Sequence, residues 1–147
     1  MTTNIDLINK LNIKSDDCVL AFGNHENIDQ QFINVEFNES MLSFLSEQKS
    51  RFDKISLLYE DKNGPIEDVV EKLLPLCNKR TLLLISKIPI VDKIRSNGKI
   101  KLNKETISDF IKSKMQITQS WFMNETNESF EFLAEVINSD RQTRRYF

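Results

Sequence analysis

Three residues in the first quarter of the chain could together hold a small polar ligand. Gly23 directly follows the apolar run 18–22, His25 comes two residues later, and Glu36 lies in the alternating segment 33–37. A glycine after a buried strand lets backbone N–H groups approach a ligand, and a carboxylate beside a neighbouring strand can accept hydrogen bonds from ribose hydroxyls. An imidazole in such a loop can act as a general base or contact the ligand. Gly23, His25 and Glu36 are therefore the candidate binding residues.

The spacing of these residues argues against a complete site. Glu36 comes 13 positions after Gly23, whereas dinucleotide folds place the ribose acid about 20 residues after the glycine loop. The whole chain of 147 residues contains three glycines. We therefore expect His25 to be a surface histidine, Glu36 to be a solvated strand residue and no cofactor to bind, with a nucleotide ligand as the alternative.

Nothing in the sequence predicts a catalytic residue or a metal site. His25 is the only histidine, and the two cysteines, Cys18 and Cys77, are far apart in the chain, so the usual zinc ligand sets cannot form. No Ser-His-Asp order supports nucleophilic catalysis. Both cysteines are expected to be buried free thiols in a reducing cytosol. The carboxylate pairs 16–17 and 60–61 could hold Mg²⁺ through water, but solvation of loops explains them better.

Hydrophobic periodicity predicts the elements that must position these residues. Continuous or alternating apolar runs indicate strands, and apolar residues at i, i+3 and i+4 indicate helices. Strands are expected at 18–22, 33–37, 53–60 and 80–86, and helices at 6–11, 39–48, 66–76 and 104–113. This alternation predicts an α/β fold with a mostly parallel sheet and helices on both faces. Segments 116–123 and 129–136 predict a C-terminal antiparallel hairpin with Trp121 and Phe122 in the core. Segment 87–102 is expected to be irregular, with one helical turn at 91–95.

Several short sequence words resemble those of Rossmann-like methyltransferases. Val35-Glu36-Phe37-Asn38-Glu39 is similar to their second strand and the helix after it, where an acidic residue meets the ribose of S-adenosylmethionine. Phe52-Asp53-Lys54-Ile55 resembles the opening of a later strand, and Thr81-Leu82-Leu83-Leu84-Ile85 resembles the strand that follows. The resemblance implies a Rossmann-like fold. As an alternative function it implies an S-adenosylmethionine-dependent methyltransferase or a nucleotide-binding protein, with the cofactor held by Gly23, His25 and Glu36.

A closer resemblance is to a bacterial family of small domains of unknown function, which itself looks like a trimmed, degenerate class I methyltransferase. Lys10-Leu11-Asn12-Ile13-Lys14 resembles the word before that family's first strand, and Asn124-Glu125-Thr126 resembles a word in its terminal hairpin. The family's hairpin tryptophan is replaced by Asn127 or Glu128. The resemblance implies a methyltransferase-like domain that is non-catalytic and acts by binding a protein or a second copy of itself.

Charge and composition limit the partners that the chain could have. Residues 87–114 carry a net charge of +5, and the tail 139–147 holds three arginines, but the whole chain has a net charge of −2. A weak nucleic-acid binder through 87–114 is therefore only a third hypothesis. No apolar stretch reaches the length of a membrane span and no signal peptide is recognisable, so we expect a cytoplasmic protein without membrane contact. We expect one domain over 1–138 and a basic tail over 139–147.

Overall fold

The structure is a computed structural model that describes seven parts of the chain: residues 10–23, 32–48, 51–89, 91–95, 98–102, 104–126 and 128–137. His25, the tail 139–147 and most of the predicted first helix lie outside these ranges. The expectations for those residues therefore stay predictions.

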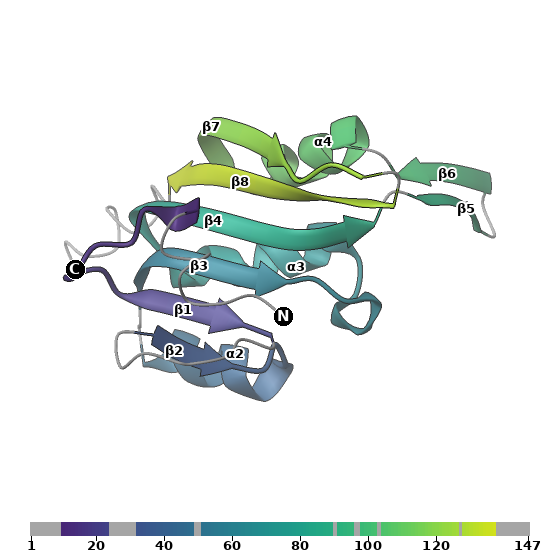
Figure 1. The fold of residues 1–147 in the computed structure, drawn as a ribbon. Coiled ribbons are helices and arrows are strands. Elements are labelled where there is room, and N and C mark those ends of the chain that lie inside the picture. Colours follow the sequence, from purple (N-terminus) through teal and green to yellow (C-terminus); the bar gives the residue numbers. More distant parts are fainter. Residues whose placement is uncertain are drawn as a thin grey trace.

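A six-stranded sheet forms the centre of the molecule (Figure 1). Its strand order is β2-β1-β3-β4-β8-β7, in which the first four strands are parallel and the last two are antiparallel to their neighbours. This confirms the predicted mostly parallel sheet with a C-terminal antiparallel hairpin. The strands are β1 (Val19–Phe22), β2 (Phe32–Val35), β3 (Phe52–Leu58), β4 (Cys77–Pro89), β7 (Gln116–Met123) and β8 (Ser129–Ile137).

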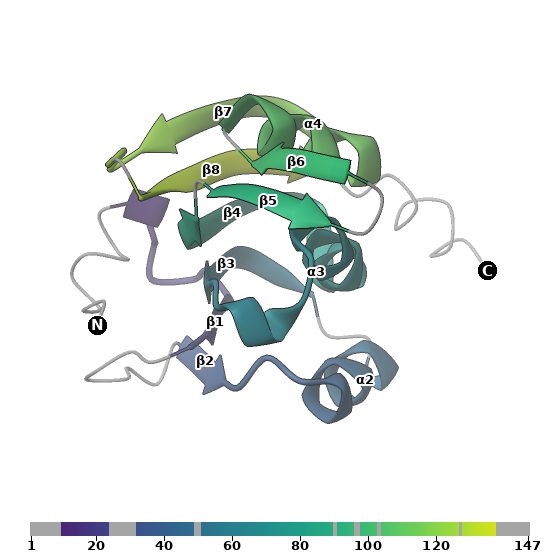
Figure 2. The same cartoon turned by 90° about the vertical axis from the view of Figure 1, so that its right-hand side faces the viewer.

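Three helices, α2 (Glu39–Glu47), α3 (Ile66–Leu73) and α4 (Lys104–Lys114), lie on the same side of the sheet (Figure 2). The start of α2 is fixed by Asn38, whose side-chain oxygen accepts a hydrogen bond from the Met41 N–H at 2.8 Å, as expected of a helix N-cap. Single turns of 3₁₀-helix, Asp61–Asn63 and Leu74–Leu76, flank α3. The end of a helix at residues 10–11 lies on the opposite face of the sheet.

The hydrophobic core follows the alternation of side chains across the sheet. Leu20, Ile55 and Leu83 are register partners on β1, β3 and β4 and belong to the large cluster beneath the helices. Their chain neighbours point the other way, and there Leu84 and Leu133 pack with Leu11 in a smaller cluster. Because strands buried on both faces need apolar residues at every position, the continuous apolar runs in the sequence predicted β1 and β4 well.

Segment 87–102 differs from its prediction. β4 continues to Pro89, and the following residues form a two-stranded antiparallel sheet of β5 (Val91–Arg95) and β6 (Gly98–Leu102). The helical turn expected at 91–95 is therefore wrong. The hairpin lies beyond the carboxyl end of β4 (Figure 1). Asn97-Gly98 is the dipeptide that favours tight hairpins, and this signal was present in the sequence.

Trp121 also departs from its expected place in the core. Its side chain is 44% exposed, whereas its neighbour Phe122 is half-buried and packs against Phe130 and Phe132, each with a ring-centroid distance of 5.5 Å. Successive residues of a strand face opposite sides of the sheet, so only one of the pair can point toward the helices. That residue is Phe122.

Both thiols are free as expected, but the expected burial is wrong for one of them. Cys18 is exposed, and Cys77 is fully buried at the start of β4. Burial raises the pKa of the Cys77 thiol from 9.0 to about 12, against a smaller lowering by its hydrogen bond with Thr81. The thiolate is the reactive form of cysteine, so Cys77 has neither the access nor the ionisation that it needs to react.

We expect a thiol reagent to modify one cysteine per folded chain at neutral pH. Titration with an aromatic disulfide should release one equivalent from native protein and two in denaturant, because only unfolding exposes Cys77. In Cys18→Ser the native protein should release none, which identifies the reactive thiol. Rapid release of two equivalents from native protein would contradict this description of Cys77.

Candidate functional site

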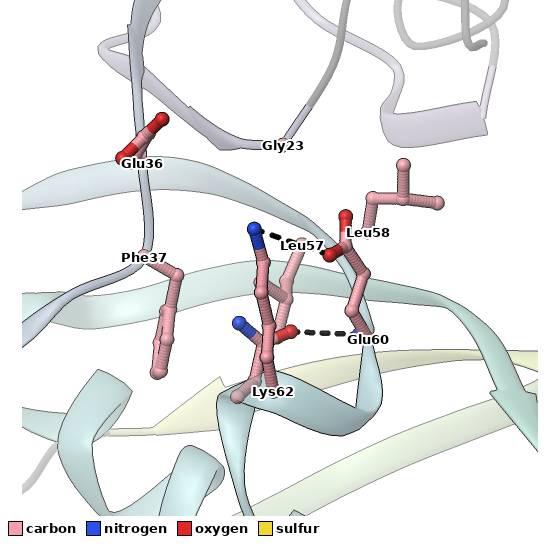
Figure 3. Close-up of a pocket in the computed structure, with 8 residues that line it drawn as sticks. Gly23, Glu36, Phe37, Leu57, Leu58, Glu60 and Lys62 are labelled. Carbon is pink, nitrogen blue, oxygen red and sulfur yellow. Dashed lines mark hydrogen bonds and ion pairs between the residues drawn. The ribbon is translucent and has the colours of Figure 1, made fainter.

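A pocket of about 300 Å³ opens at the carboxyl ends of β1, β2 and β3 (Figure 3). It brings together two of the three candidate residues, Gly23 and Glu36, while His25 lies outside the described residues. The other lining residues come from the end of β3 and the loop after it, or directly follow β2. They are Phe37, Leu57, Leu58, Glu60, Lys62 and Asn63.

The topology explains why a pocket lies here. β1 has β2 on one side and β3 on the other, so the chain leaves β1 in one direction and later returns past it to reach β3. In open parallel sheets the carboxyl ends at such a switch in strand order leave a crevice, and ligands bind there. Gly23 follows β1 at this point, and Glu36 is the first residue after β2.

Gly23 is required by the packing of the protein itself. Its φ of +117° is a conformation that side chains rarely adopt, and a Cβ atom would lie 2.7 Å from Leu58 Cβ. The Gly23 N–H donates to the Val35 carbonyl at 3.4 Å, which joins the ends of β1 and β2. The space that this glycine leaves is thus taken by Leu58, and the open part of the pocket lies beside it.

Glu36 presents an exposed carboxylate to the pocket. Within the described parts of the chain, no hydrogen bond or ion pair is found for it. Phe37, the next residue, packs edge-on against Phe22 at a centroid distance of 5.3 Å, and this contact anchors the backbone that carries the carboxylate. An accessible acceptor on an anchored backbone can receive hydrogen bonds from a ligand.

The opposite wall of the pocket is a braced loop. Lys62 Nζ lies 3.3 Å from the Glu60 carboxylate, and the Glu60 N–H donates to Asn63 Oδ1 at 2.7 Å. The Tyr59 hydroxyl donates to the Gly64 carbonyl at 2.5 Å. Figure 3 shows the Lys62 and Glu60 side chains together, across the pocket from Gly23 and Glu36. The candidate residues predicted from the sequence did not include Phe37, Lys62 or Asn63, although the acidic pair 60–61 after a strand was a signal for this loop.

The other acidic candidates do not form a metal centre. Asp17 accepts a hydrogen bond from the Lys14 N–H at 2.8 Å and lies 3.7 Å from Lys54 Nζ, so its position is explained by local structure. In the described ranges no group of three or more His, Cys, Asp or Glu residues could hold a metal ion. Likewise, none of the described helices is long and apolar enough to cross a membrane.

The hairpin word Asn124-Glu125-Thr126 serves the turn between β7 and β8. Thr126 Oγ1 accepts hydrogen bonds from the N–H groups of Glu128 and Ser129, at 3.1 and 3.0 Å. Asn124 Nδ2 donates to the buried Glu131 carboxylate at 2.6 Å, and Lys10 Nζ reaches the same carboxylate at 3.0 Å. Two of the sequence words that carried the resemblance, around Lys10 and Asn124, therefore meet at one structural contact.

Comparison with known proteins shows a fold and no sequence relative. No protein-family model matches the chain, and no curated protein matches it. Among solved structures, the chain is similar to a SAM-dependent methyltransferase from Aquifex aeolicus, with a TM-score of 0.56 and 9% identity over 90% of this chain and 89% of that one.

Two further solved structures support the same fold. SMU.776, provisionally named a methyltransferase and solved with SAH, gives a TM-score of 0.51 at 7% identity over 82% of this chain. A provisionally named O-methyltransferase from Nostoc punctiforme gives 0.52 at 8% identity over 88%. This chain spans only 45% and 53% of those two proteins. The fold of the chain is therefore the Rossmann-like fold of the methyltransferases, as its sequence words implied.

Proposed function

We propose that this domain binds a ribonucleoside ligand of the S-adenosylmethionine and S-adenosylhomocysteine class in the pocket between Gly23 and Lys62. One observation carries the proposal: the exposed Glu36, whose carboxylate has no hydrogen-bond or ion-pair partner among the described residues, lines a pocket at the switch in strand order of a methyltransferase-like sheet. It reverses our expectation that no cofactor binds.

The chemistry of the pocket fits the ribose part of such a ligand. A carboxylate can accept hydrogen bonds from two adjacent hydroxyl groups, and charged acceptors make stronger hydrogen bonds than neutral ones. Phe37 and Leu57 supply apolar surface next to it. A volume of about 300 Å³ is at the small end for ligand sites, which favours a single nucleoside over a dinucleotide.

We also propose that the domain acts through binding and not through methyl transfer. Lys62 is paired with Glu60, and Asn63 accepts from the Glu60 backbone, so these polar groups of the far wall brace one another. This arrangement favours a wall that holds a ligand in place over one that activates a second substrate. The non-catalytic role implied by the sequence resemblance agrees with this proposal.

We expect S-adenosylhomocysteine at about 100 times its dissociation constant to raise the melting temperature by about 5 to 10 °C, because a ligand that binds only the folded state stabilises it. Its 2′,3′-dideoxy analogue should bind about tenfold more weakly or worse, since Glu36 then has no hydroxyl to accept from. The measurement is a thermal melt against ligand concentration.

Glu36→Gln is the variant that tests the residue assignment. It should weaken the natural nucleoside and bring its affinity close to that of the dideoxy analogue. Glu47→Gln, an exposed carboxylate at the end of α2 that does not line this pocket, should bind like the original chain. An unchanged melting temperature with S-adenosylhomocysteine would overturn the proposal, and an equal effect of both variants on its affinity would overturn the role of Glu36. Release of a labelled methyl group to an acceptor would contradict the non-catalytic role.

A further inference from the structure

β7 is an edge strand of the sheet, and its composition leaves this edge unprotected. Its only described strand neighbour is β8, so its outer side carries backbone groups that no described strand pairs. Exposed edges are usually blunted by charged residues, proline or short length. β7 has eight residues, Gln116-Ile117-Thr118-Gln119-Ser120-Trp121-Phe122-Met123, without a charge or a proline. The opposite edge strand, β2, has only four.

Trp121 gives this edge an exposed aromatic side chain that a partner could contact. Its side chain is 44% exposed on the face that carries Leu133 on β8. The one irregularity of the strand, a register shift between Ile117 and Gln119, leaves residues 119–123 as a regular ladder with Trp121 at its centre. Aromatic side chains opposite one another across a strand pair stabilise the pairing.

We propose that β7 pairs antiparallel with β7 of a second copy of this chain, about a two-fold axis near Trp121. Two features favour a second copy over another strand. An uncharged strand meets itself without like-charge repulsion, and the flanks of β7 are complementary in sign. The exposed Lys112 precedes it and the exposed Glu128 follows it, whereas Lys114 is already paired with Glu71 at 3.3 Å. Antiparallel pairing therefore sets the basic end of each strand, at Lys112, against the partner's acidic end.

The geometry of the pair follows from the symmetry. A two-fold axis perpendicular to the sheet keeps the same face up in both copies, so the two Trp121 side chains lie next to each other on one surface. The result is a continuous sheet across both copies with a closed, isologous interface. The interface is a single strand pair, so we expect a weak dimer whose population rises with concentration. It is distant from the proposed ligand pocket, because β7 and β1 lie four positions apart in the sheet.

The test is sedimentation and fluorescence against protein concentration. Trp121 is the only tryptophan, so its emission reports the interface directly: we expect a shift to shorter wavelength as the mass approaches that of two chains. Trp121→Lys places like charges at the axis and should weaken dimerisation about tenfold or more. Gln116→Lys, at the exposed start of the same strand, lies toward the partner's acidic end and should leave the dimer intact.

A charge-swap experiment separates self-pairing at Trp121 from any other interface. Trp121→Lys and Trp121→Glu should each be monomeric alone and should form a mixed dimer when combined. Trp121 is exposed, so both variants should keep the circular dichroism of the original fold. If the sedimenting mass stays that of one copy at protein concentrations up to about 1 mM, the proposal is overturned. A dimer that Trp121→Lys does not weaken would do the same, as would a mixture that stays monomeric.

Discussion

Gly23→Ala is expected to destabilise the fold by about 3 kcal/mol or more. Two costs add at this position: a φ of +117° that alanine rarely adopts, and a new Cβ that would lie 2.7 Å from Leu58 Cβ. The first is worth about 1–3 kcal/mol, and the second forces two backbone segments apart, which costs about as much again. Urea unfolding of the original and variant chains measures the sum.

Gly64→Ala is the matched control for this prediction. Gly64 also has a positive φ, of +95°, but a Cβ there would meet nothing within 4 Å. We therefore expect a loss of only about 1–2 kcal/mol, and the difference between the two variants isolates the steric contact with Leu58. Equal losses would show that the contact between β1 and β3 at this pocket is looser than described.

Gly23→Ala also links the stability of the fold to the proposed function. Leu58 and Gly23 both line the pocket, so moving Leu58 to make room for a methyl group changes the shape of the site. Nucleoside affinity should fall in Gly23→Ala and remain unchanged in Gly64→Ala. Gly23 thus has a structural reason to be glycine even if no ligand ever approaches its backbone, which its position in the sequence alone did not reveal.

The elements that were predicted correctly are those whose signal is local. α2 has an apolar face and an Asn38 cap, and β1 and β4 are continuous apolar runs, so their residues dictate their structure with little help from the rest of the chain. β5 and β6 were missed because Pro89 and Asn97-Gly98 were interpreted as interruptions of a basic segment, although Asn-Gly also favours a tight hairpin turn. Trp121 was misplaced because which face of β7 meets the helices depends on register with β8, a tertiary property.

The candidate site could be predicted only in part for a related reason. Gly23 and Glu36 follow strands that the sequence predicts, and their meeting at one pocket follows from parallel strand order. Lys62 and Asn63 reach the pocket through the braced loop after β3, whose course depends on the Glu60 and Tyr59 hydrogen bonds. No periodicity in the sequence encodes that course.

Two of the three sequence words that resembled methyltransferases, those around Phe52 and Thr81, are fold determinants at the other end of the sheet from the pocket. Asp53, from the word around Phe52, accepts hydrogen bonds from the Cys18 N–H at 2.9 Å and from Asn78 Nδ2 at 3.1 Å. These bonds tie together the amino ends of β1, β3 and β4. The pocket lies at the opposite, carboxyl ends of the parallel strands, so these hydrogen bonds are away from it. The residues that make them therefore support the fold whatever the domain binds.

Thr81 is the buried centre of that network, and Thr81→Val should cost about 3 kcal/mol. Its hydroxyl donates to the Phe52 carbonyl at 2.7 Å and accepts from the Asn78 N–H at 2.7 Å, and its side chain is fully buried. Valine has nearly the same shape but leaves both backbone groups without this partner, each at a cost of about 1–3 kcal/mol.

Thr81→Ser reverses the chemistry of that test, because it keeps the hydroxyl and removes the methyl group. It should cost only about 1 kcal/mol, the value of a buried methyl group, so serine should be the milder change although valine is the closer match in shape. Urea unfolding ranks the two variants. Nucleoside affinity, measured on the folded fraction, should stay unchanged in both, since Thr81 braces the amino ends of the strands and the proposed ligand binds at their carboxyl ends. A valine variant as stable as the serine variant would show that packing, and not the hydroxyl, holds β3 and β4 together there.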